Sequence, residues 1–231
     1  MGKLFTFGCS YTAEFADGDY INYRKWRGGK YPKTWVNHLA DKLEIPFTNY
    51  GQSASSNSKI LSQFCKHSSE IEKGDIVIIE WSYMSRFRWV NFATNGWSDF
   101  GAGWFGGNEM MEKVTFNEII HNRSHKRYVE ELYDYEMLID SYAKAKDFKV
   151  FYWSCDENVI NNNPKRISER KYLCGSQIKL NETMFSPVFE KGGQRISEET
   201  NGVINDLHFG ETAHEVMADL FYEYITNVKL I

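Results

Sequence analysis

Residues 3 to 12 of this 231-residue chain read Lys3-Leu4-Phe5-Thr6-Phe7-Gly8-Cys9-Ser10-Tyr11-Thr12. The apolar run Leu4–Phe7 has the length of a buried strand, and Gly8 ends it. Ser10 follows just beyond the carboxyl end of that strand, which is where ligands sit in open α/β sheets. A serine is weakly nucleophilic until a base takes its proton, so Ser10 indicates a catalytic site only together with a base.

The candidate base is His208, which lies in the segment Asn205-Asp206-Leu207-His208-Phe209-Gly210. This segment comes just ahead of a predicted final helix. Asp206 stands two residues before His208 and can orient its imidazole toward Ser10. The two ends of the chain therefore predict a Ser10–His208–Asp206 triad.

The composition is that of a soluble globular protein, with 42% hydrophobic and 25% charged residues. The net charge of -4 and the pI near 5.9 give no reason to expect nucleic-acid binding. No apolar run approaches the ~20 residues that span a bilayer, so we expect no membrane partner. The sequence shows no signal peptide, which favours a cytoplasmic protein, although a phage or virion component would look the same.

Strand and helix patterns alternate along the chain. The predicted strands are Leu4–Phe7, 45–50, 76–79 and 150–153, and the predicted helices are Trp35–Leu43, 56–72, 127–146 and 211–228. A loop is expected over 13–31, an aromatic-rich insertion over about 83–116 and a polar excursion over about 156–201. This order predicts a single domain over residues 1–231, a three-layer α/β/α sandwich with a mostly parallel sheet.

The insertion carries three tryptophans, Trp89, Trp97 and Trp104, in a chain that is 16% aromatic. Two interpretations stay open for these side chains. In the first, they form a substrate-binding wall that packs flat against sugar rings. In the second, they pack in the core and in a lid of the protein itself.

The cysteines and paired histidines predict no metal site. The four cysteines, Cys9, Cys65, Cys155 and Cys174, lack the paired spacing of metal or redox motifs, and reduced thiols are expected. His121 and His125 stand one helical turn apart, but no third ligand is evident, so solvated positions are favoured.

Four short blocks, spread over nearly the whole chain, resemble the SGNH (GDSL-type) hydrolase family. The family's first block, Gly-Asp-Ser-x-Thr or Ser, corresponds to residues 8–12, so the nucleophile carries over to Ser10 while Cys9 replaces the aspartate. The second block, Asn-x-Gly-x-x-Gly, appears at 49–54, with Ala54 in the place of the oxyanion glycine. The third block, Gly-x-Asn-Asp, matches this sequence poorly, and Ser82 occupies the position of the family's asparagine.

In the family's last block, Asp-x-x-His, a second histidine follows six residues later, as His208 and His214 do here. Three residues before His208, where the family has its aspartate, this chain has Asn205. The nearest carboxylate is that of Asp206, two residues before His208. We favour Asp206, because a neutral amide cannot stabilise an imidazolium as a carboxylate does. His214 is interpreted as structural.

The resemblance implies a flavodoxin-like SGNH hydrolase fold and a serine esterase that needs no metal or organic cofactor. It implies an oxyanion hole formed by Ser10, Ala54 and Ser82. The tryptophans favour a small-molecule or glycan ester as substrate, such as an O-acetyl group on a carbohydrate. The alternatives are a catalytically weak or inactive glycan-binding module and an O-acyltransferase. The sequence does not indicate whether the chain forms oligomers.

Overall fold

The computed structural model describes residues 2–15, 20–83, 86–91, 96–100, 125–156 and 185–227. Their central feature is a four-stranded sheet in the order β2-β1-β3-β6, in which every neighbouring pair is parallel. The strands are β1 (Leu4–Phe7), β2 (Phe47–Asn49), β3 (Ile76–Trp81) and β6 (Lys149–Ser154). The carboxyl ends of the strands consequently lie along one edge of the sheet.

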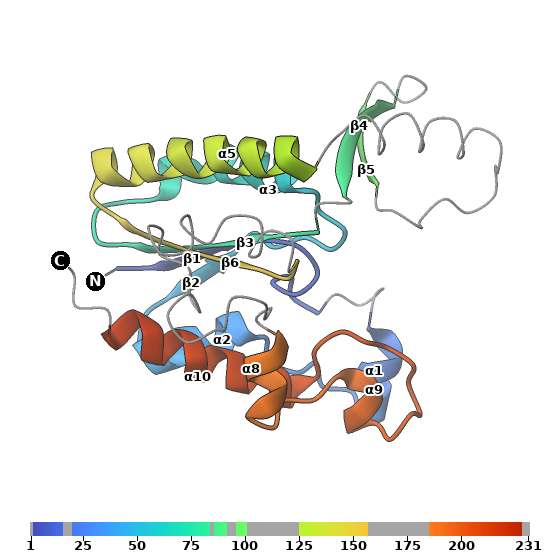
Figure 1. The fold of residues 1–231 in the computed structure, drawn as a ribbon. Coiled ribbons are helices and arrows are strands. Elements are labelled where there is room, and N and C mark those ends of the chain that lie inside the picture. The colour runs from blue at the N-terminus through green and yellow to red at the C-terminus, as the bar shows by residue number, and fades with distance from the viewer. Residues whose placement is uncertain are drawn as a thin grey trace.

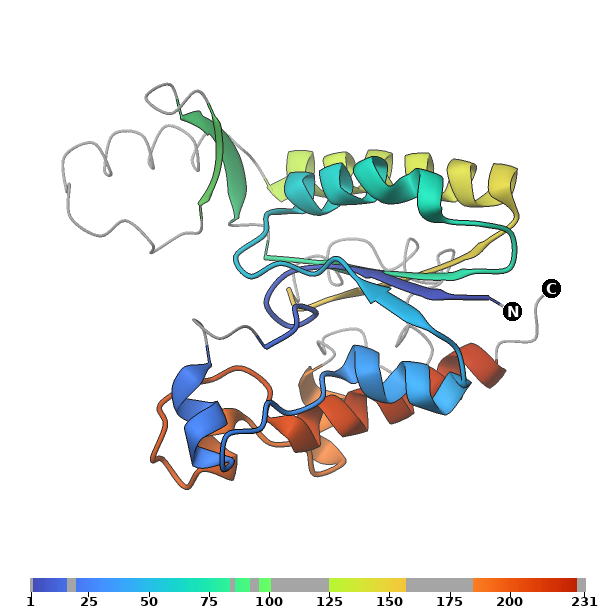
Figure 2. The same ribbon diagram turned by 180° about the vertical axis from the view of Figure 1, so that it is seen from behind.

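Helices cover both faces of this sheet (Figures 1 and 2). On one face lie α2 (Trp35–Leu43), α8 (Phe185–Glu190) and α10 (Glu211–Asn227), and on the other lie α3 (Asn57–His67) and α5 (His125–Lys146). The predicted three-layer α/β/α class with a parallel sheet is therefore confirmed.

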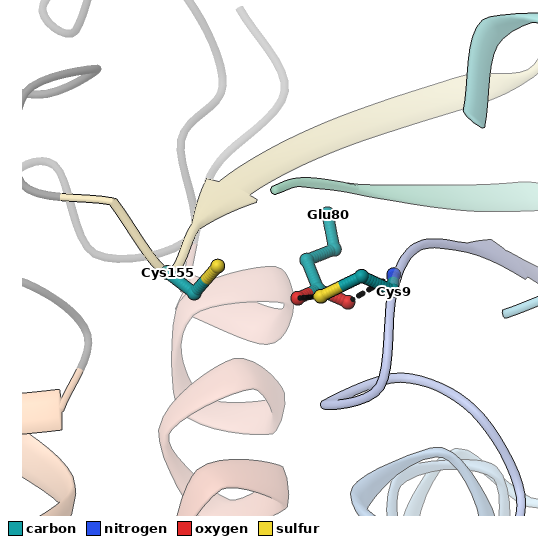
Figure 3. Close-up of side chains that lie close together, drawn as sticks. All are labelled: Cys9, Glu80 and Cys155. Carbon is teal, nitrogen blue, oxygen red and sulfur yellow. Dashed lines mark hydrogen bonds between the residues drawn. The ribbon is translucent and has the colours of Figure 1, made fainter. Parts of the chain in front are cut away.

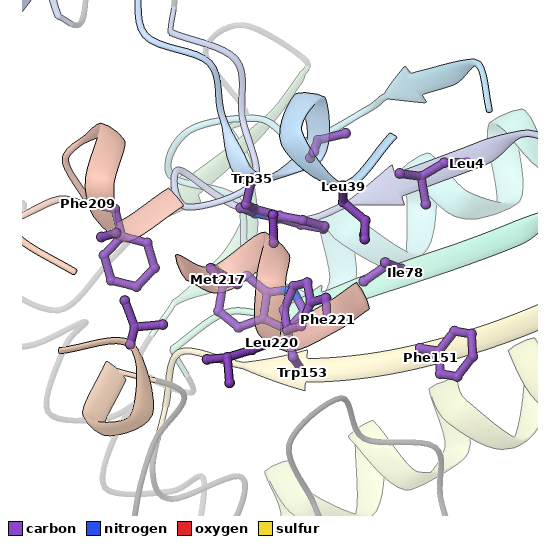
Figure 4. Close-up of a cluster of buried hydrophobic side chains, with 14 of the residues drawn as sticks. Leu4, Trp35, Leu39, Ile78, Phe151, Trp153, Phe209, Met217, Leu220 and Phe221 are labelled. Carbon is purple, nitrogen blue, oxygen red and sulfur yellow. The ribbon is translucent and has the colours of Figure 1, made fainter. Parts of the chain in front are cut away.

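Two apolar cores, one on each face, hold the layers together. Ile78 points into the core with α2 and α10, where Trp35, Trp153 and Phe221 pack edge to face or tilted (Figure 4). Its neighbours in β3 point into the opposite core with α3 and α5. This strand is apolar on both faces because both faces are covered by helices.

The helix boundaries follow local signals. Asn37 in α2 accepts a hydrogen bond from the backbone N–H of Thr34 (2.7 Å). Ser56 accepts one from the backbone N–H of Lys59 (3.4 Å) at the start of α3. That helix ends earlier than predicted, at His67, and a short 3₁₀ helix, Ser68–Glu70, continues from it.

The loop predicted over 13–31 was wrong in part, because it contains the short helix α1 (Ile21–Trp26). Tyr23 of this helix is buried in a small cluster with Tyr20 and Ile196. Ile196 begins α9 (Ile196–Glu199), which lies within the predicted polar excursion. Contacts between distant segments stabilise both short helices, and a local sequence pattern does not report such contacts.

The described part of the aromatic-rich insertion forms an antiparallel pair, β4 (Phe87–Asn91) and β5 (Gly96–Phe100). Figure 1 shows this pair beyond the end of α5, on the side of the molecule toward which β1 and β3 run. Among the described helices, none is both long and apolar enough to cross a bilayer.

Candidate active site

A tight turn after β1 presents Ser10. The carbonyl oxygen of Cys9 accepts hydrogen bonds from the backbone N–H groups of Thr12 (3.1 Å) and Ala13 (2.9 Å). The chain therefore reverses immediately past the strand. Ser10 lies within this turn at the carboxyl edge of the sheet and is partly exposed.

Ser10, His208 and Asp206 form a continuous hydrogen-bonded chain. Nε2 of His208 lies 3.1 Å from Oγ of Ser10, and Nδ1 of His208 lies 2.7 Å from Oδ1 of Asp206. The same carboxylate oxygen accepts a hydrogen bond from the backbone N–H of His208 (2.8 Å). Asn205, the alternative partner, is exposed. Of the two neighbours considered in the sequence, Asp206 is the one that contacts the imidazole.

The carboxylate determines which ring nitrogen carries the proton. An ionised carboxylate only accepts hydrogen bonds, so Nδ1 of His208 donates to Asp206 and Nε2 is left as an acceptor toward Ser10. Burial raises the pKa of Asp206, but the hydrogen bonds from the His208 side chain and backbone outweigh burial, and its pKa lies below the ordinary value. Asp206 is therefore ionised at neutral pH.

The segment that carries Asp206 and His208 is anchored by α9. The backbone N–H of Ser197 donates to the carbonyl of Asp206 (2.9 Å), and that of Ile196 donates to the carbonyl of His208 (3.0 Å). The ring of Tyr11 lies 5.2 Å from the imidazole of His208, between ring centroids. These contacts fix the position and the tilt of the imidazole.

A second loop, residues 50–56, follows β2, and Asn49 at the end of that strand joins it to the Ser10 turn. The side-chain oxygen of Asn49 accepts from the Thr6 hydroxyl (2.9 Å) and from the backbone N–H of Gly51 (2.8 Å), and its amide donates to the carbonyl of Thr12 (2.6 Å). Gly51 packs directly on the Ser10 turn, because a Cβ there would lie 2.7 Å from the backbone nitrogen of Ala13. The two loops are thus held in close contact.

Ala54, the predicted oxyanion residue of the second loop, has a φ of 63°. This left-handed conformation favours glycine and strains a residue with a Cβ. Among the hydrogen bonds between described residues, none uses the backbone N–H of Ala54 or of Ser10. Both N–H groups are therefore available to a ligand.

Ser82, the third predicted oxyanion residue, is fully buried. Its backbone N–H donates to Oδ1 of Asn57 (2.7 Å), and its carbonyl accepts from the Asn57 amide (3.1 Å). Its hydroxyl accepts a hydrogen bond from the Arg86 guanidinium (3.0 Å), which leaves the hydroxyl proton as the one remaining donor. The sequence pattern did not assign Asn57 or Arg86 to Ser82.

A buried cluster of two thiols and a carboxylate lies next to the Ser10 turn (Figure 3). The carboxylate of Glu80 accepts hydrogen bonds from the backbone N–H of Cys9 (2.8 Å) and from its thiol (2.7 Å). Cys155 completes the cluster, and Sγ of Cys9 lies 4.0 Å from Oγ of Ser10.

The environment shifts the pKa values in this cluster in opposite directions. Burial raises the pKa of Cys9, but the hydrogen bond with Cys155, the charge of Arg86 and the hydrogen bond with Glu80 together outweigh burial and lower the pKa well below the ordinary value. Burial, followed by the charge and hydrogen bond of Cys9, raises the pKa of Glu80. Burial likewise raises the pKa of Cys155. The cluster therefore brings three acidic groups together in the core, each of which alters the protonation of the others.

Cysteine spacing could not reveal this cluster, since Cys9 and Cys155 are far apart in the sequence. A usable signal was nevertheless present. Each of the three residues lies at or just past the carboxyl end of a predicted strand, and the ends of neighbouring parallel strands meet at one edge.

Two of the three predicted substrate-binding tryptophans lie in the described part of the chain. Trp89 lies in β4 and Trp97 in β5, while Trp104 lies outside the described residues. His125 begins α5, and His121 lies outside the described part of the chain. His214 is buried in α10, where its Nδ1 accepts a hydrogen bond from the backbone N–H of Trp35 (3.2 Å) at the start of α2.

No protein-family model matches this sequence, and no curated protein matches it. Solved structures do match the fold. A GDSL-family lipolytic protein from Veillonella parvula is 14% identical with a TM-score of 0.53, and the match covers 99% of this chain and 100% of that one. A putative GDSL-family lipolytic protein from Desulfitobacterium hafniense is 10% identical with a TM-score of 0.49, covering 97% and 99%. An acetylxylan esterase from Geobacillus stearothermophilus, solved as a catalytic mutant, is 13% identical with a TM-score of 0.41, covering 97% and 95%. The match to the Veillonella parvula protein shows that the chain has an SGNH hydrolase-like fold, as its sequence blocks predicted.

Proposed function

We propose that this protein is a serine esterase of the SGNH type, in which Ser10, His208 and Asp206 are the catalytic residues. The observation that carries the proposal is the hydrogen-bonded chain from the Ser10 hydroxyl through His208 to Asp206. A hydroxyl, an imidazole and a carboxylate in this order are the groups that nucleophilic acyl transfer requires.

In the proposed mechanism, Nε2 of His208 takes the hydroxyl proton of Ser10 as Oγ attacks the carbonyl carbon of the ester. The tetrahedral intermediate collapses when the bond to the alcohol breaks, and the imidazolium returns its proton to the alcohol oxygen. His208 then takes a proton from water as the water oxygen attacks the acyl carbon. The bond to Oγ of Ser10 breaks, the imidazolium returns the proton to Oγ, and the acid is released. Asp206 keeps the imidazole oriented and stabilises its positive charge in both halves of the reaction.

The negative charge of each tetrahedral intermediate needs hydrogen-bond donors. We assign the backbone N–H groups of Ser10 and Ala54 to this role, since neither has a partner among the described residues. The hydroxyl of Ser82, held by Arg86, is the proposed third donor. Loss of one good donor in such a site costs about 10²–10³ in rate.

For the substrate we propose an acyl ester on a carbohydrate, such as an O-acetyl group. The support is the aromatic composition of the insertion, in which Trp89 and Trp97 lie on adjacent antiparallel strands. Figure 1 shows these strands at the end of the molecule where β1 and β3 end. Flat aromatic faces pack well against the apolar faces of sugar rings.

The test compares hydrolysis of p-nitrophenyl acetate and of an acetylated xylo-oligosaccharide by the wild type and two variants. We expect Ser10→Ala to abolish both activities. The control Ser141→Ala, which alters an exposed serine on α5, should retain them. Sugar binding without turnover by the wild type would contradict the esterase and favour a binding module. Acyl transfer to an added alcohol in preference to water would favour a transferase.

A further inference from the structure

Three metal-ligating side chains, from the ends of three different strands, converge in the core. Cys9 follows β1, Glu80 lies near the end of β3, and Cys155 follows β6; one ligand atom from each lies within 4.8 Å of the other two (Figure 3). All three residues are buried, with exposed fractions of 0%, 0% and 2%. Cysteine and glutamate side chains seldom meet in an otherwise apolar core unless they bind one another or a ligand.

We propose that Cys9, Glu80 and Cys155 form a binding site for a zinc ion. Zinc is bound in proteins by thiolate sulfur and carboxylate oxygen at about 2.3 Å and 2.1 Å, so neighbouring ligand atoms in a tetrahedral site lie about 3.5–3.8 Å apart. Sγ of Cys9 and Oε1 of Glu80 lie 2.7 Å apart and would have to separate by about 1 Å, while the other ligand atoms lie within 4.8 Å of one another and would have to approach by about 1 Å or less. Magnesium and calcium fit poorly, because both prefer a shell of oxygen ligands.

Charge balance is compatible with a divalent cation at this position. Two thiolates and one carboxylate carry three negative charges, and Arg86 acts on the cluster with one positive charge. The buried cluster can become neutral only by holding two protons or one divalent cation. A zinc ion would therefore make the site electrically neutral together with Arg86, and buried charges are stable only when they are compensated in this way.

The backbone also leaves room for the carboxylate. A Cβ at Gly8 would lie 2.3 Å from Oε2 of Glu80 and 2.7 Å from its Cβ, so a side chain at this position would displace Glu80. The family resemblance expects an aspartate where Cys9 stands, and here a thiol takes its place beside a carboxylate from β3. The site would join the ends of β1, β3 and β6 directly beside the Ser10 turn.

The test uses the full chain, produced in zinc-supplemented medium and purified without a metal-affinity tag or chelator. Elemental mass spectrometry should find about one zinc per chain. Metal-free protein is then titrated with cobalt(II), which gives strong near-ultraviolet absorption when thiolates bind it. We expect this absorption to saturate at about one cobalt per chain and zinc to abolish it.

Single-residue variants locate the site. Cys9→Ser and Cys155→Ser should each weaken cobalt binding by more than the 10–100-fold that loss of an outer-shell partner typically costs. Glu80→Gln should weaken it as well. Cys65→Ser, which alters an exposed cysteine on α3, is the matched control and should leave binding unchanged. Circular dichroism checks that each variant folds. If a variant does not fold, the cobalt titration of the wild-type chain still tests whether the metal site exists.

Several results would overturn the proposal. One is a wild-type chain that holds no stoichiometric zinc and develops no thiolate–cobalt absorption. Another is absorption that survives in both Cys9→Ser and Cys155→Ser. A third is a Cys9–Cys155 disulfide in the unreduced purified protein. The proposal does not rest on the esterase, because a zinc-loaded chain without turnover would leave it standing.

Discussion

Nε2 of His208 lies 3.1 Å from Oγ of Ser10, although 198 positions separate the two residues in the chain. The first strand delivers Ser10, whereas α9 holds the segment that carries His208. The proposed chemistry therefore depends on docking of the C-terminal third of the chain onto the N-terminal turn. Small changes in either segment should alter activity before they alter the fold.

The first prediction concerns the orienting carboxylate. Asp206→Asn should lower kcat for ester hydrolysis by roughly 10⁴-fold while the fold is retained, because the amide neither fixes the Nδ1-protonated tautomer nor offsets the charge of the imidazolium. Single-turnover cleavage of p-nitrophenyl acetate measures the effect. Asn205→Ala is the control and should cost little, since Asn205 is exposed. A silent Asp206→Asn beside an inactive Asn205→Ala would reverse the assignment.

The second prediction concerns the strained residue of the proposed oxyanion loop. Ala54 has a φ of 63°, so Ala54→Gly should keep the N–H in place and leave activity and stability unchanged or slightly higher. Ala54→Val should lower the free energy of unfolding by about 1–3 kcal/mol and reduce kcat, because a β-branched side chain resists this conformation. Chemical denaturation and steady-state kinetics test both variants. Equal behaviour of glycine and valine would contradict the strained geometry.

The third prediction concerns Asn49, which joins the two loops. Asn49→Asp keeps the acceptor for the Thr6 hydroxyl and the Gly51 N–H, but it places an oxygen against the carbonyl of Thr12. The free energy of unfolding should fall by about 1–3 kcal/mol, and kcat/KM should fall with it. Asn201→Asp makes the same chemical change at an exposed turn and should be nearly neutral. An Asn49→Asp variant with wild-type stability would contradict the role of this amide.

Much of this architecture could be predicted from local patterns. Strands β1, β3 and β6 contain short apolar runs, and the helix Trp35–Leu43 has clear apolar periodicity. Parallel strands place their carboxyl ends together, which is how Ser10 and the loop at 49–54 could be assigned to one edge. The spacing of Asp206 and His208 suggested which groups would meet Ser10. These features depend mainly on residues near one another in the sequence.

Other features depend on contacts between distant segments and could not be predicted from local patterns. Helix α1 is held by burial of Tyr23 against Ile196, more than half the chain away. The cluster of Cys9, Glu80 and Cys155 needs the order of three strands in the sheet, which spacing does not supply. The binding of Ser82 by Asn57 and Arg86 is likewise a property of the folded chain.

The fourth prediction concerns stability at acid pH. Burial lowers the pKa of His214 to about 3, so between pH ~6.5 and ~3 the unfolded chain binds a proton that the folded chain does not. Stability should therefore fall as pH falls, by about 1.4 kcal/mol per pH unit from this residue. His214→Asn keeps an acceptor for the Trp35 N–H and should make the dependence shallower. Denaturant unfolding from pH 7 to pH 4 measures both slopes, and parallel slopes would contradict the prediction.

The most direct test of the proposed esterase is covalent labelling with a fluorophosphonate, which reacts with an activated serine, followed by mapping of the modified peptide. The proposal predicts one phosphonyl group per chain on Ser10, with labelling lost in His208→Ala and strongly slowed in Asp206→Asn. A folded wild-type chain that remains unlabelled, or that is labelled at a serine other than Ser10, would contradict it.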